Sequence, residues 1–381
     1  MMLYLDHNAT TPMAAEVKLA MEPFWCSDFG NASSVHRFGQ RARQAIDLAR
    51  EQLASLIAAP AEQIVFTSGG TEADNLALRG VFERGLADRL LISAVEHPAV
   101  AATAEALRQA GREVVVAPVD ADGRVVLERL AELVDRRTLV SVMWANNDVG
   151  TIQPLEQIVA LAHERGALVH SDAVQAVGKL AVDVNVVPVD LLSVSAHKLN
   201  GPKGVGALYY RRGLSLAPQL RGGAQERRLR AGTENVTAIV GFGAAAALAK
   251  SKLLAGEPAH WLNLRESLAA ALEQRVGECW VNGAGASRLP NTLSIGFSGV
   301  EGAALLMNLD LKGIAVSVGS ACSSGTAEPS RVLLAMGQSP RQAAAAVRIS
   351  FGLGNTPEQL AEIVEAIAES IERLRSIEGA K

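Results

Sequence analysis

The chain of 381 residues has very little cysteine: Cys26, Cys279 and Cys322 are its only three, and they lie far apart. An odd number of separated cysteines excludes a disulfide scaffold and a zinc site built from cysteines, and it fits a reducing cytosol. The chain also lacks an excess of charge of one sign, because 36 basic residues face 40 acidic ones. It therefore has no global basic surface for nucleic acid or anionic lipid.

Long hydrophobic runs are missing as well. The longest apolar stretch covers residues 237–249, about thirteen residues, which we expect to be too short to span a bilayer. The amino terminus has no basic region followed by an apolar one, so we expect no secretory signal. Apolar residues make up 49% and charged residues 20%, which excludes disorder. We expect a cytoplasmic globular protein, independent of membranes and large enough to be an enzyme.

Residues 42–210 alternate between helix-like and strand-like patterns. Helical periodicity occurs at 41–57, 71–85, 99–110 and 155–166, and short apolar segments occur at 63–68, 90–97, 113–118, 138–145, 167–172, 190–195 and 204–210. Short strands separated by helices predict a mainly parallel sheet covered on both faces. The last two strands are joined too closely for a crossover helix, so we expect them to pair antiparallel.

The pattern changes after about residue 256. A long helix is expected at 260–276, short strands at 279–282, 291–297, 314–318 and 346–352, and a terminal helix at 357–377. Such an order is typical of an α+β domain. We predict a large α/β domain over residues 15–255, and a small domain formed by residues 1–14 and 256–381 that carries Cys322.

The segment IVFTSGGTEADN places a glycine turn between a buried strand and a helix. Backbone amides at Gly70 and Thr71 could hold a phosphate there, helped by the positive end of the helix. The alternative is an ordinary turn in which Thr71 caps the helix and Asp74 completes a capping box. Taken alone, the segment favours this alternative, because it matches no nucleotide fingerprint.

A second segment, ALVHSDAVQA, puts Asp172 just beyond a buried strand, where open α/β sheets bind ligands. An acid there, with Gln175 one helical turn further on, could pair with a protonated ring nitrogen and hold a ring hydroxyl. The alternative is a helix cap.

A third segment, DLLSVSAHKLNGPKG, places Lys198 after a strand of apolar residues. Partial burial there would lower the pKa of its amine and make it competent for a Schiff base, with Lys203 as a solvated competitor. A phosphate cradle, an acid at a strand end and then such a lysine is the order found in pyridoxal-phosphate enzymes.

Many further motifs then carry a resemblance to a known family. They are YLDHNATTP, FGNASSVHRFGQ, FTSGGTEADN, EHPAV, NNDVGTIQP, SDAVQAVGK, SAHKLNGPKGVGALY, RAGTEN and GSACSSGTAEPS. From Tyr4 to the strand AVRISFG, the chain resembles the cysteine desulfurases of class V aminotransferase type, in the nitrogen-fixation and iron–sulfur-cluster group. The resemblance implies a fold-type I pyridoxal-phosphate transferase with a mainly parallel seven-stranded sheet and a smaller α+β domain.

The resemblance also implies roles for single residues. Catalysis would rest on Lys198, which holds the cofactor, on His97, which stacks on its ring and transfers protons, and on Cys322. The remaining contacts to pyridoxal 5'-phosphate would come from Gly70, Thr71, Asn147, Asp172, Gln175, Ser195, His197 and, from the other subunit of a homodimer, Thr233. Asn147 and Arg348 would bind the substrate, with the guanidinium on its carboxylate. No metal site is implied, although a transient contact of Cys322 with an iron–sulfur cluster stays open.

Three departures from the family pattern are small. Gly70 stands where Ala is common, His7 where Asn is common and Val318 where Ser is common. Gly70 keeps its backbone amide, so the phosphate cradle should survive. Val318 puts the mobility of the loop around Cys322 in mild doubt, and it leaves the chemistry unaffected.

Cys322 can also be judged from its own surroundings. It lies among small polar residues in SVGSACSSGT, which predicts an exposed, mobile loop with a reactive thiol. Cys26 and Cys279, beside Trp25 and Trp280, are expected to be buried and inert.

The function implied is conversion of L-cysteine to L-alanine, with a persulfide on Cys322. The sulfur would pass to an acceptor protein for iron–sulfur cluster assembly, a thio-cofactor or tRNA thiolation, with no direct contact to nucleic acid. The rivals are a selenocysteine lyase, a small-amino-acid aminotransferase and a catalytically silent binding scaffold. An aminotransferase has no use for Cys322, and a silent scaffold has no need of Lys198, Asp172, His97 and Arg348 together.

Overall fold

The computed structural model describes residues 2–319 and 328–378. Its larger sheet consists of β2 (Ile64–Thr67), β3 (Arg89–Ser93), β4 (Glu113–Ala117), β5 (Thr138–Ser141), β6 (Leu168–Asp172), β7 (Leu191–Ser195) and β8 (Gly206–Tyr210). Their order in space is β2-β8-β7-β6-β5-β3-β4. All neighbours are parallel except at β8, which is antiparallel to both β7 and β2. The mainly parallel seven-stranded sheet and its antiparallel pair β7–β8 are confirmed.

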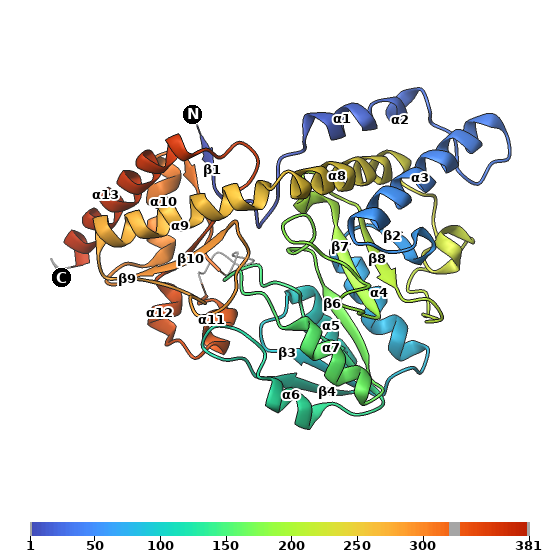
Figure 1. Ribbon diagram of the computed structural model, residues 1–381, viewed down its shortest axis with the longest axis horizontal. Helices are drawn as coiled ribbons and strands as arrows, with labels where there is room; N and C mark the ends of the chain where they lie inside the picture. The colour runs from blue at the N-terminus through green and yellow to red at the C-terminus, as the bar shows by residue number, and fades with distance from the viewer. Residues whose placement is uncertain (1, 320–327, 379–381) are drawn as a thin grey trace.

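Helices cover both faces of this sheet (Figure 1). They are α3 (Arg37–Leu56), α4 (Gly70–Glu83), α5 (Pro98–Gln109), α6 (Leu127–Leu133), α7 (Leu155–Glu164) and α8 (Val236–Leu254). Two shorter helices, α1 (Ala15–Met21) and α2 (Pro23–Cys26), lie against α8. Successive strand residues point to opposite faces. Along β7, Leu192 and Val194 join the apolar cluster that includes α3, α7 and α8, whereas Leu191 joins the cluster that includes α4 and α5. Burial on both faces explains why the strands read as continuous apolar runs.

Helix α8 extends beyond the apolar stretch seen in the sequence. It has 19 residues and is, by length and composition alone, apolar enough to cross a membrane, although 44% of that stretch is buried inside the protein. The side chains of Ile239, Phe242 and Ala246 are buried in the same cluster as Ile46 and Leu53 of α3. The apolar composition of α8 is therefore explained by its packing in the core of the protein.

The remainder of the chain forms smaller sheets with their own helices. Strands β9 (Cys279–Val281), β10 (Thr292–Phe297) and β12 (Ala346–Ser350) form an antiparallel sheet, and β1 (Leu3–Tyr4) pairs in parallel with β11 (Ile314–Ala315). The helices here are α9 (Glu257–Val276), α10 (Gly302–Leu311), α11 (Arg331–Ala335), α12 (Pro340–Ala344) and α13 (Leu360–Glu378). Leu3 and Leu5 lie in the apolar cluster of this part together with residues of α9 and α13. The predicted domain boundaries stay a prediction.

Single-turn helices complete the described elements: η1 (Ala61–Gln63), η2 (Ala196–Lys198), η3 (Gln225–Arg228) and η4 (Pro357–Gln359). The prediction that Cys26 is buried is wrong. Cys26 ends the short helix α2 and is exposed, as is its neighbour Trp25. A local apolar neighbour did not produce burial, because no other element covers this corner of the chain within the described residues. Cys279 is half-buried, and burial raises the pKa of its thiol.

Candidate active site

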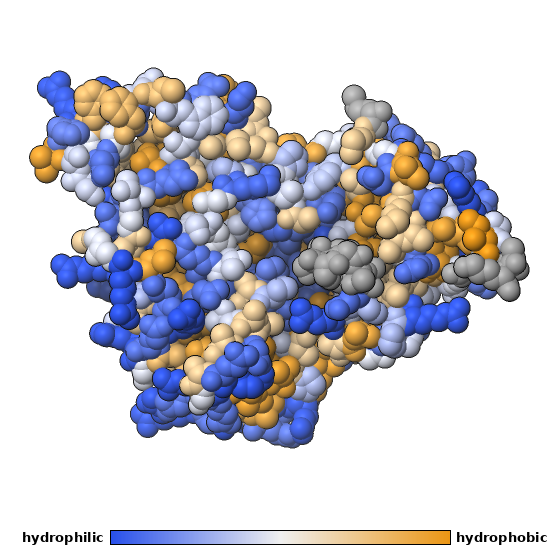
Figure 2. All heavy atoms as spheres, turned by 180° about the vertical axis from the view of Figure 1, so that it is seen from behind, coloured by the Kyte–Doolittle hydropathy of each residue, from blue (hydrophilic) through white to orange (hydrophobic). Residues whose placement is uncertain are grey.

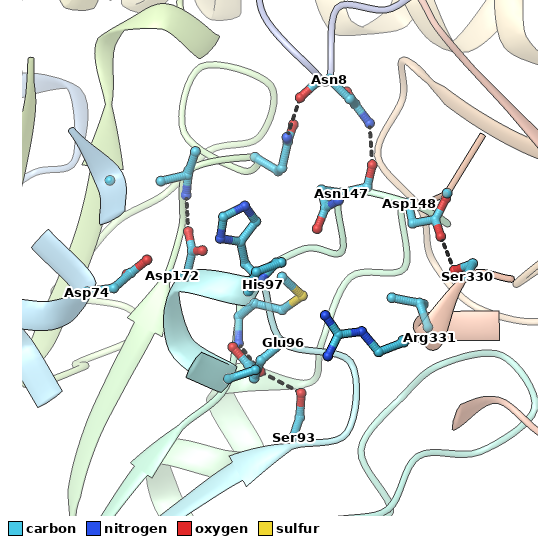
Figure 3. Close-up of a pocket in the computed structure, with 18 of the residues that line it drawn as sticks. Asn8, Asp74, Ser93, Glu96, His97, Asn147, Asp148, Asp172, Ser330 and Arg331 are labelled. Carbon is cyan, nitrogen blue, oxygen red and sulfur yellow. Dashed lines mark hydrogen bonds between the residues drawn. The ribbon is translucent and has the colours of Figure 1, made fainter. Parts of the chain in front are cut away.

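A cavity of about 1060 Å³ opens at the carboxyl ends of the parallel strands (Figure 3). This is the edge where open α/β sheets bind their ligands. Ten of the residues singled out in the sequence line it: Gly70, Thr71, His97, Asn147, Asp172, Gln175, Ser195, His197, Lys198 and Arg348. These ten residues come from six separate stretches of the chain, and they meet at one place.

One end of the cavity is formed by the amino terminus of α4. The helix begins at Gly70, with Gly69 in the cap position, so the prediction that Thr71 caps it is wrong. A Cβ on Gly206 would lie 2.5 Å from the carbonyl carbon of Gly69, so the turn before α4 rests directly on β8. The amides of Gly70 and Thr71 meet no acceptor among the described residues, and they open toward the cavity.

Asp172 is the last residue of β6 and is buried. One carboxylate oxygen accepts a hydrogen bond from the amide of Val174 at 2.9 Å. The following residues form turns, so the predicted helix after Asp172 is absent from this described stretch, and Gln175 lies in a turn. Burial, and then the neighbouring Asp74, raise the pKa of Asp172 to about 6. A cationic ring nitrogen would reverse this effect, because an opposite charge favours the ionised carboxylate.

Asp74 and His97 lie close to this carboxylate. Each of Asp74, His97 and Asp172 brings a ligand atom to within 4.8 Å of the others, which is close enough to surround a cation. Burial raises the pKa of Asp74 to about 7, so its carboxyl group is close to half neutral at neutral pH. Asp172 is therefore the carboxylate that ionises more readily of the two.

Lys198 ends the short helix η2 directly after β7. Its Nζ donates to the backbone carbonyls of Asn8, at 2.5 Å, and Ala9, at 2.6 Å. Neither partner is charged. Burial, and then the positive charge of Arg348, lower the pKa of the amine from 10.5 to about 8. The competitor Lys203 is exposed.

His97 caps the amino terminus of α5. Its Nδ1 accepts a hydrogen bond from the amide of Ala99 at 3.1 Å. Burial lowers the pKa of the ring, so the imidazole is neutral at pH 7. Since Nδ1 acts as an acceptor, the hydrogen of the neutral ring is assigned to Nε2. The ring can therefore present an N–H donor.

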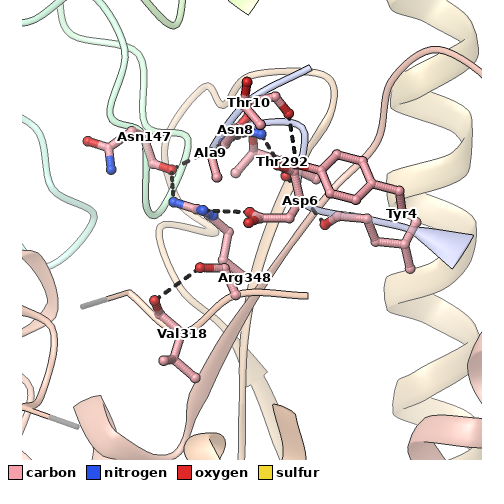
Figure 4. Close-up of polar contacts among 12 residues, drawn as sticks. Tyr4, Asp6, Asn8, Ala9, Thr10, Asn147, Thr292, Val318 and Arg348 are labelled. Carbon is pink, nitrogen blue, oxygen red and sulfur yellow. Dashed lines mark hydrogen bonds and ion pairs between the residues drawn. The ribbon is translucent and has the colours of Figure 1, made fainter. Parts of the chain in front are cut away.

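Arg348 lies on β12 and reaches the cavity from the side of the smaller sheets (Figure 4). Its guanidinium donates to Asp6 Oδ1 at 2.7 Å and to the carbonyl of Asn147 at 3.0 Å. Its Nε is buried without a partner among the described residues. Two contacts leave further N–H groups for a small carboxylate.

The comparisons with known proteins agree with this geometry. The family model "Aminotransferase class-V" matches residues 3–363.

The chain belongs to the class V aminotransferase family.

A cysteine desulfurase IscS of Dictyoglomus turgidum is 44% identical over 378 residues, which cover 98% of this chain and 96% of the relative. Among solved structures, a NifS-like protein has a TM-score of 0.91 at 38% identity, over 98% of this chain and 100% of its own. A structure of SspA in complex with cysteine has a TM-score of 0.80 at 32% identity, over 92% of this chain and 98% of its own. The chain is thus an enzyme of the cysteine desulfurase kind, in a family that depends on pyridoxal phosphate. The predicted family and fold class are confirmed.

One predicted site residue within the described part of this class V chain does not line the cavity. Thr233 is exposed in the segment before α8. Cys322 lies outside the described residues, but Gly319 and Glu328, on either side of that segment, both line the cavity.

Other cavity residues were missed by the reading of the sequence. Glu96 accepts from Ser93 Oγ at 2.5 Å and from the amide of Met143 at 2.9 Å, while its Oε2 is enclosed without a partner among the described residues. Burial raises the pKa of Glu96 to about 8. Asp6 and Asn8 come from the amino-terminal segment and also line the cavity. Their contacts to Arg348 and Lys198 are tertiary, and the only sequence signal for them is the motif YLDHNATTP itself.

Proposed function

We propose that this chain is a pyridoxal-phosphate-dependent enzyme that takes sulfur from L-cysteine, releases L-alanine and holds the sulfur as a persulfide on Cys322. The observation that carries the proposal is the amine of Lys198. It is half-buried, has no charged partner among the described residues, and lies in one cavity with Asp172 and the first turn of α4.

The residues present fit the cofactor at each of its ends. The amides of Gly70 and Thr71, with Ser195 and His197, would hold the phosphate, because free amides at a helix start favour an anion. Burial lowers the pKa of His197 to about 4, so its ring would contribute as a neutral hydrogen-bonding group. Asp172 would face the ring nitrogen, and Gln175 the ring hydroxyl.

When bound, the cofactor supplies an aldehyde that links to amines and a ring that takes up an electron pair from the substrate. The amine of Lys198 would anchor the cofactor covalently and would act as the base that carries the Cα proton of the substrate. His97 offers an N–H at Nε2, which suits donation to the amine or thiol. Asn147 and Arg348 would orient the cysteine carboxylate. The related structure of SspA in complex with cysteine supports cysteine as the substrate.

The sulfur step uses the chain's own thiol. The thiolate of Cys322 attacks the sulfur of the substrate, an S–S bond forms, and the C–S bond breaks with its electron pair left on the carbon side. That carbon then takes up a proton, so that L-alanine leaves and Cys322 keeps one additional sulfur atom. The described residues on either side of the segment that carries Cys322, Gly319 and Glu328, both line the cavity, and this supports the proposal.

The same proposal includes a homodimer. Trp25, Phe29, Val35 and Phe38, in and between α2 and α3, expose apolar side chains at one corner of the molecule. Figure 2 shows apolar side chains mixed with hydrophilic ones over this corner, at the upper left. Val35 is 90% exposed, and the rings of Phe29 and Phe38 stack 5.4 Å apart. An apolar cluster of this kind is typical of a protein interface.

Thr233 lies on the side of this corner. The next residue, Glu234, is buried and forms an ion pair of 2.6 Å with Arg43 on α3, the helix that carries Phe38. In the proposed homodimer, the partner docks on this corner and receives Thr233 near its own phosphate site, as the family resemblance implies.

Subunit mixing tests this arrangement. Lys198→Ala and Thr233→Ala dimers should each be impaired, whereas a mixed dimer regains one site with both residues intact. Phe29→Asp should yield monomers in sedimentation, and Met307→Asp, on the exposed surface of α10, should not. Unchanged dimers of Phe29→Asp, or no recovery on mixing, would contradict the interface.

The sulfur acceptor we propose is a cluster scaffold or thiolation protein in the cytoplasm. The function itself is tested by loading the purified protein with pyridoxal phosphate, reducing it with borohydride and mapping the modified peptide. The label should be on Lys198, and L-cysteine should yield L-alanine. A label on Lys203, or alanine formed only from selenocysteine, would refute the assignment.

A further inference from the structure

Lys179 is a second buried lysine beside the cavity. It is 5% exposed and lies in the turns after β6, four residues beyond Gln175. Its Nζ donates to Gln175 Oε1 at 2.6 Å and to Asn8 Oδ1 at 3.1 Å. No carboxylate pairs with it in the described part of the chain. A buried cation bound only to two amide oxygens is costly, and therefore calls for an explanation.

The contact to Lys179 fixes the orientation of the Gln175 amide. An ammonium group has no acceptor, so the atom that faces Lys179 must be the amide oxygen. The amide nitrogen donates to the backbone carbonyl of Asn8 at 2.9 Å. Its second hydrogen is left for the cavity, which Gln175 lines. Gln175 can thus act toward a ligand only as a donor.

The second partner, Asn8, is equally fixed. Its amide nitrogen donates to Thr292 Oγ1 at 2.9 Å and to the carbonyl of Asn147 at 3.1 Å, and its oxygen also accepts from Asn291 at 3.2 Å. The backbone carbonyl of Asn8 accepts from both Gln175 and Lys198. Lys179 therefore contacts Gln175 directly and is connected to Lys198 through Asn8.

We propose that Lys179 is a positioning residue, which holds Gln175 as a hydrogen-bond donor to the ring hydroxyl oxygen of pyridoxal phosphate and supplies the positive charge behind that oxygen. This inference rests on the proposed function. It names a residue that acts through Gln175 and does not touch the cofactor itself.

The charges around Lys179 favour this role. Burial, and then the positive charges of Lys198 and Arg348, lower the pKa of Lys179 well below 10.5, so its ammonium form is disfavoured unless a negative charge lies nearby. His7 and His197 are the other titratable groups that interact electrostatically with Lys179, and burial lowers the pKa of both rings to about 4. The groups around Lys179 are thus positive or neutral. An ionised ring oxygen would provide the missing negative charge.

The test is a pH titration of the visible absorbance of the cofactor-loaded resting protein, together with the dissociation constant of the cofactor. Lys179→Met removes the charge at similar volume, so the titration midpoint should rise by about one pH unit or more, because loss of a nearby cation favours the protonated form. Cofactor affinity should fall. Lys203→Met, which removes an exposed cation near the same loop, is the matched control and should leave the midpoint unchanged.

Two further variants distinguish the effect of Lys179 on the orientation of Gln175 from the effect of its charge and from an effect on folding. Lys179→Gln can still donate to Gln175 but carries no charge, so it should preserve affinity better than Lys179→Met while its midpoint still rises. If Lys179→Met does not fold, Lys179→Gln carries the test alone. In a Gln175→Leu background, Lys179→Met should lower cofactor affinity less than it does in the wild type, because the two residues act as one unit.

An unchanged midpoint in a folded, loaded Lys179 variant, or fully additive losses of affinity, would overturn the proposal. Either result would show Lys179 to be structural only. Failure of the wild-type protein to bind pyridoxal phosphate would instead refute the proposed function, so the two failures can be told apart.

Discussion

The lowered pKa of Lys198 should govern how fast the cofactor-free protein captures pyridoxal phosphate. Only the unprotonated amine attacks an aldehyde. Burial and Arg348 lower this pKa from 10.5 to about 8. At pH 7 about one amine in ten is then neutral, against about one in three thousand for an ordinary lysine, so the reactive fraction is about 300-fold larger.

The expected profile follows from the sign of this shift. Below pH 8 the neutral fraction rises about tenfold per pH unit, and above pH 8 it levels off. Stopped-flow mixing of cofactor-free protein with pyridoxal phosphate between pH 6 and pH 10 should show a capture rate with this shape. Arg348→Met removes the second cause of the shift, so its midpoint should move toward higher pH.

Two controls sharpen the measurement. Lys203→Met should leave the profile unchanged, because that side chain is exposed, and Lys198→Ala should abolish capture. A wild-type rate that keeps rising up to pH 10 would refute the reasoning, since it would mean that the amine titrates as an ordinary lysine.

Two further predictions concern the groups around this amine, and a third concerns the buried ion pair of 2.7 Å between Arg50 of α3 and Glu226 of η3. Asp172→Asn should lower kcat about 100-fold or more while cofactor affinity changes much less, because a fixed charge facing the ring acts mainly in the transition state; an unaltered kcat would make Asp172 structural. Asp74→Asn should keep both cofactor affinity and Tm close to wild type, because burial already leaves this carboxyl about half neutral at pH 7. A large fall in affinity, measured by cofactor titration, or in Tm would show that its charge is needed. Arg50→Met should lower the free energy of unfolding by about 3–5 kcal/mol in urea denaturation, since it leaves Glu226 buried with its charge unpaired. The double variant Arg50→Met with Glu226→Leu should recover most of that loss. Equal losses in the single and the double variant would contradict an origin in the charge pair.

The sequence alone could predict the positions of those site residues that lie at the ends of strands. Asp172 and Lys198 each follow a short apolar segment, and neighbouring strands of a parallel sheet end at one edge, so their approach could be predicted from element order. The antiparallel pair β7–β8 followed in the same way from its short connection.

Local rules failed where contacts between distant segments decide the structure. Thr71 looks like a helix cap, but Gly69, which lies close to Gly206, takes the cap position, so the helix begins two residues earlier than a Thr71 cap implies. Cys26 looks buried beside Trp25, yet no other described element covers it. Neither outcome can be read from neighbours in the chain.

Lys179 and Glu96 were missed for a related reason. Both lie inside the motifs SDAVQAVGK and EHPAV, in which the resemblance assigns roles to Asp172, Gln175 and His97 but not to Lys179 or Glu96. A lysine among apolar residues, four positions after Gln175, is a signal that could have been used. Its partner Asn8 lies 171 positions away in the chain, and only the folded structure shows that contact.

The most direct test of the account is the fate of sulfur on Cys322. Wild-type protein incubated with L-cysteine should release L-alanine and gain about 32 Da in intact mass, reversible by dithiothreitol, as expected for a persulfide on an accessible thiol. Cys322→Ala should bind pyridoxal phosphate and L-cysteine normally but release almost no alanine and gain no sulfur, whereas Cys26→Ala and Cys279→Ala should behave like wild type. Normal alanine release by Cys322→Ala would contradict the account and indicate a lyase that does not use its own thiol.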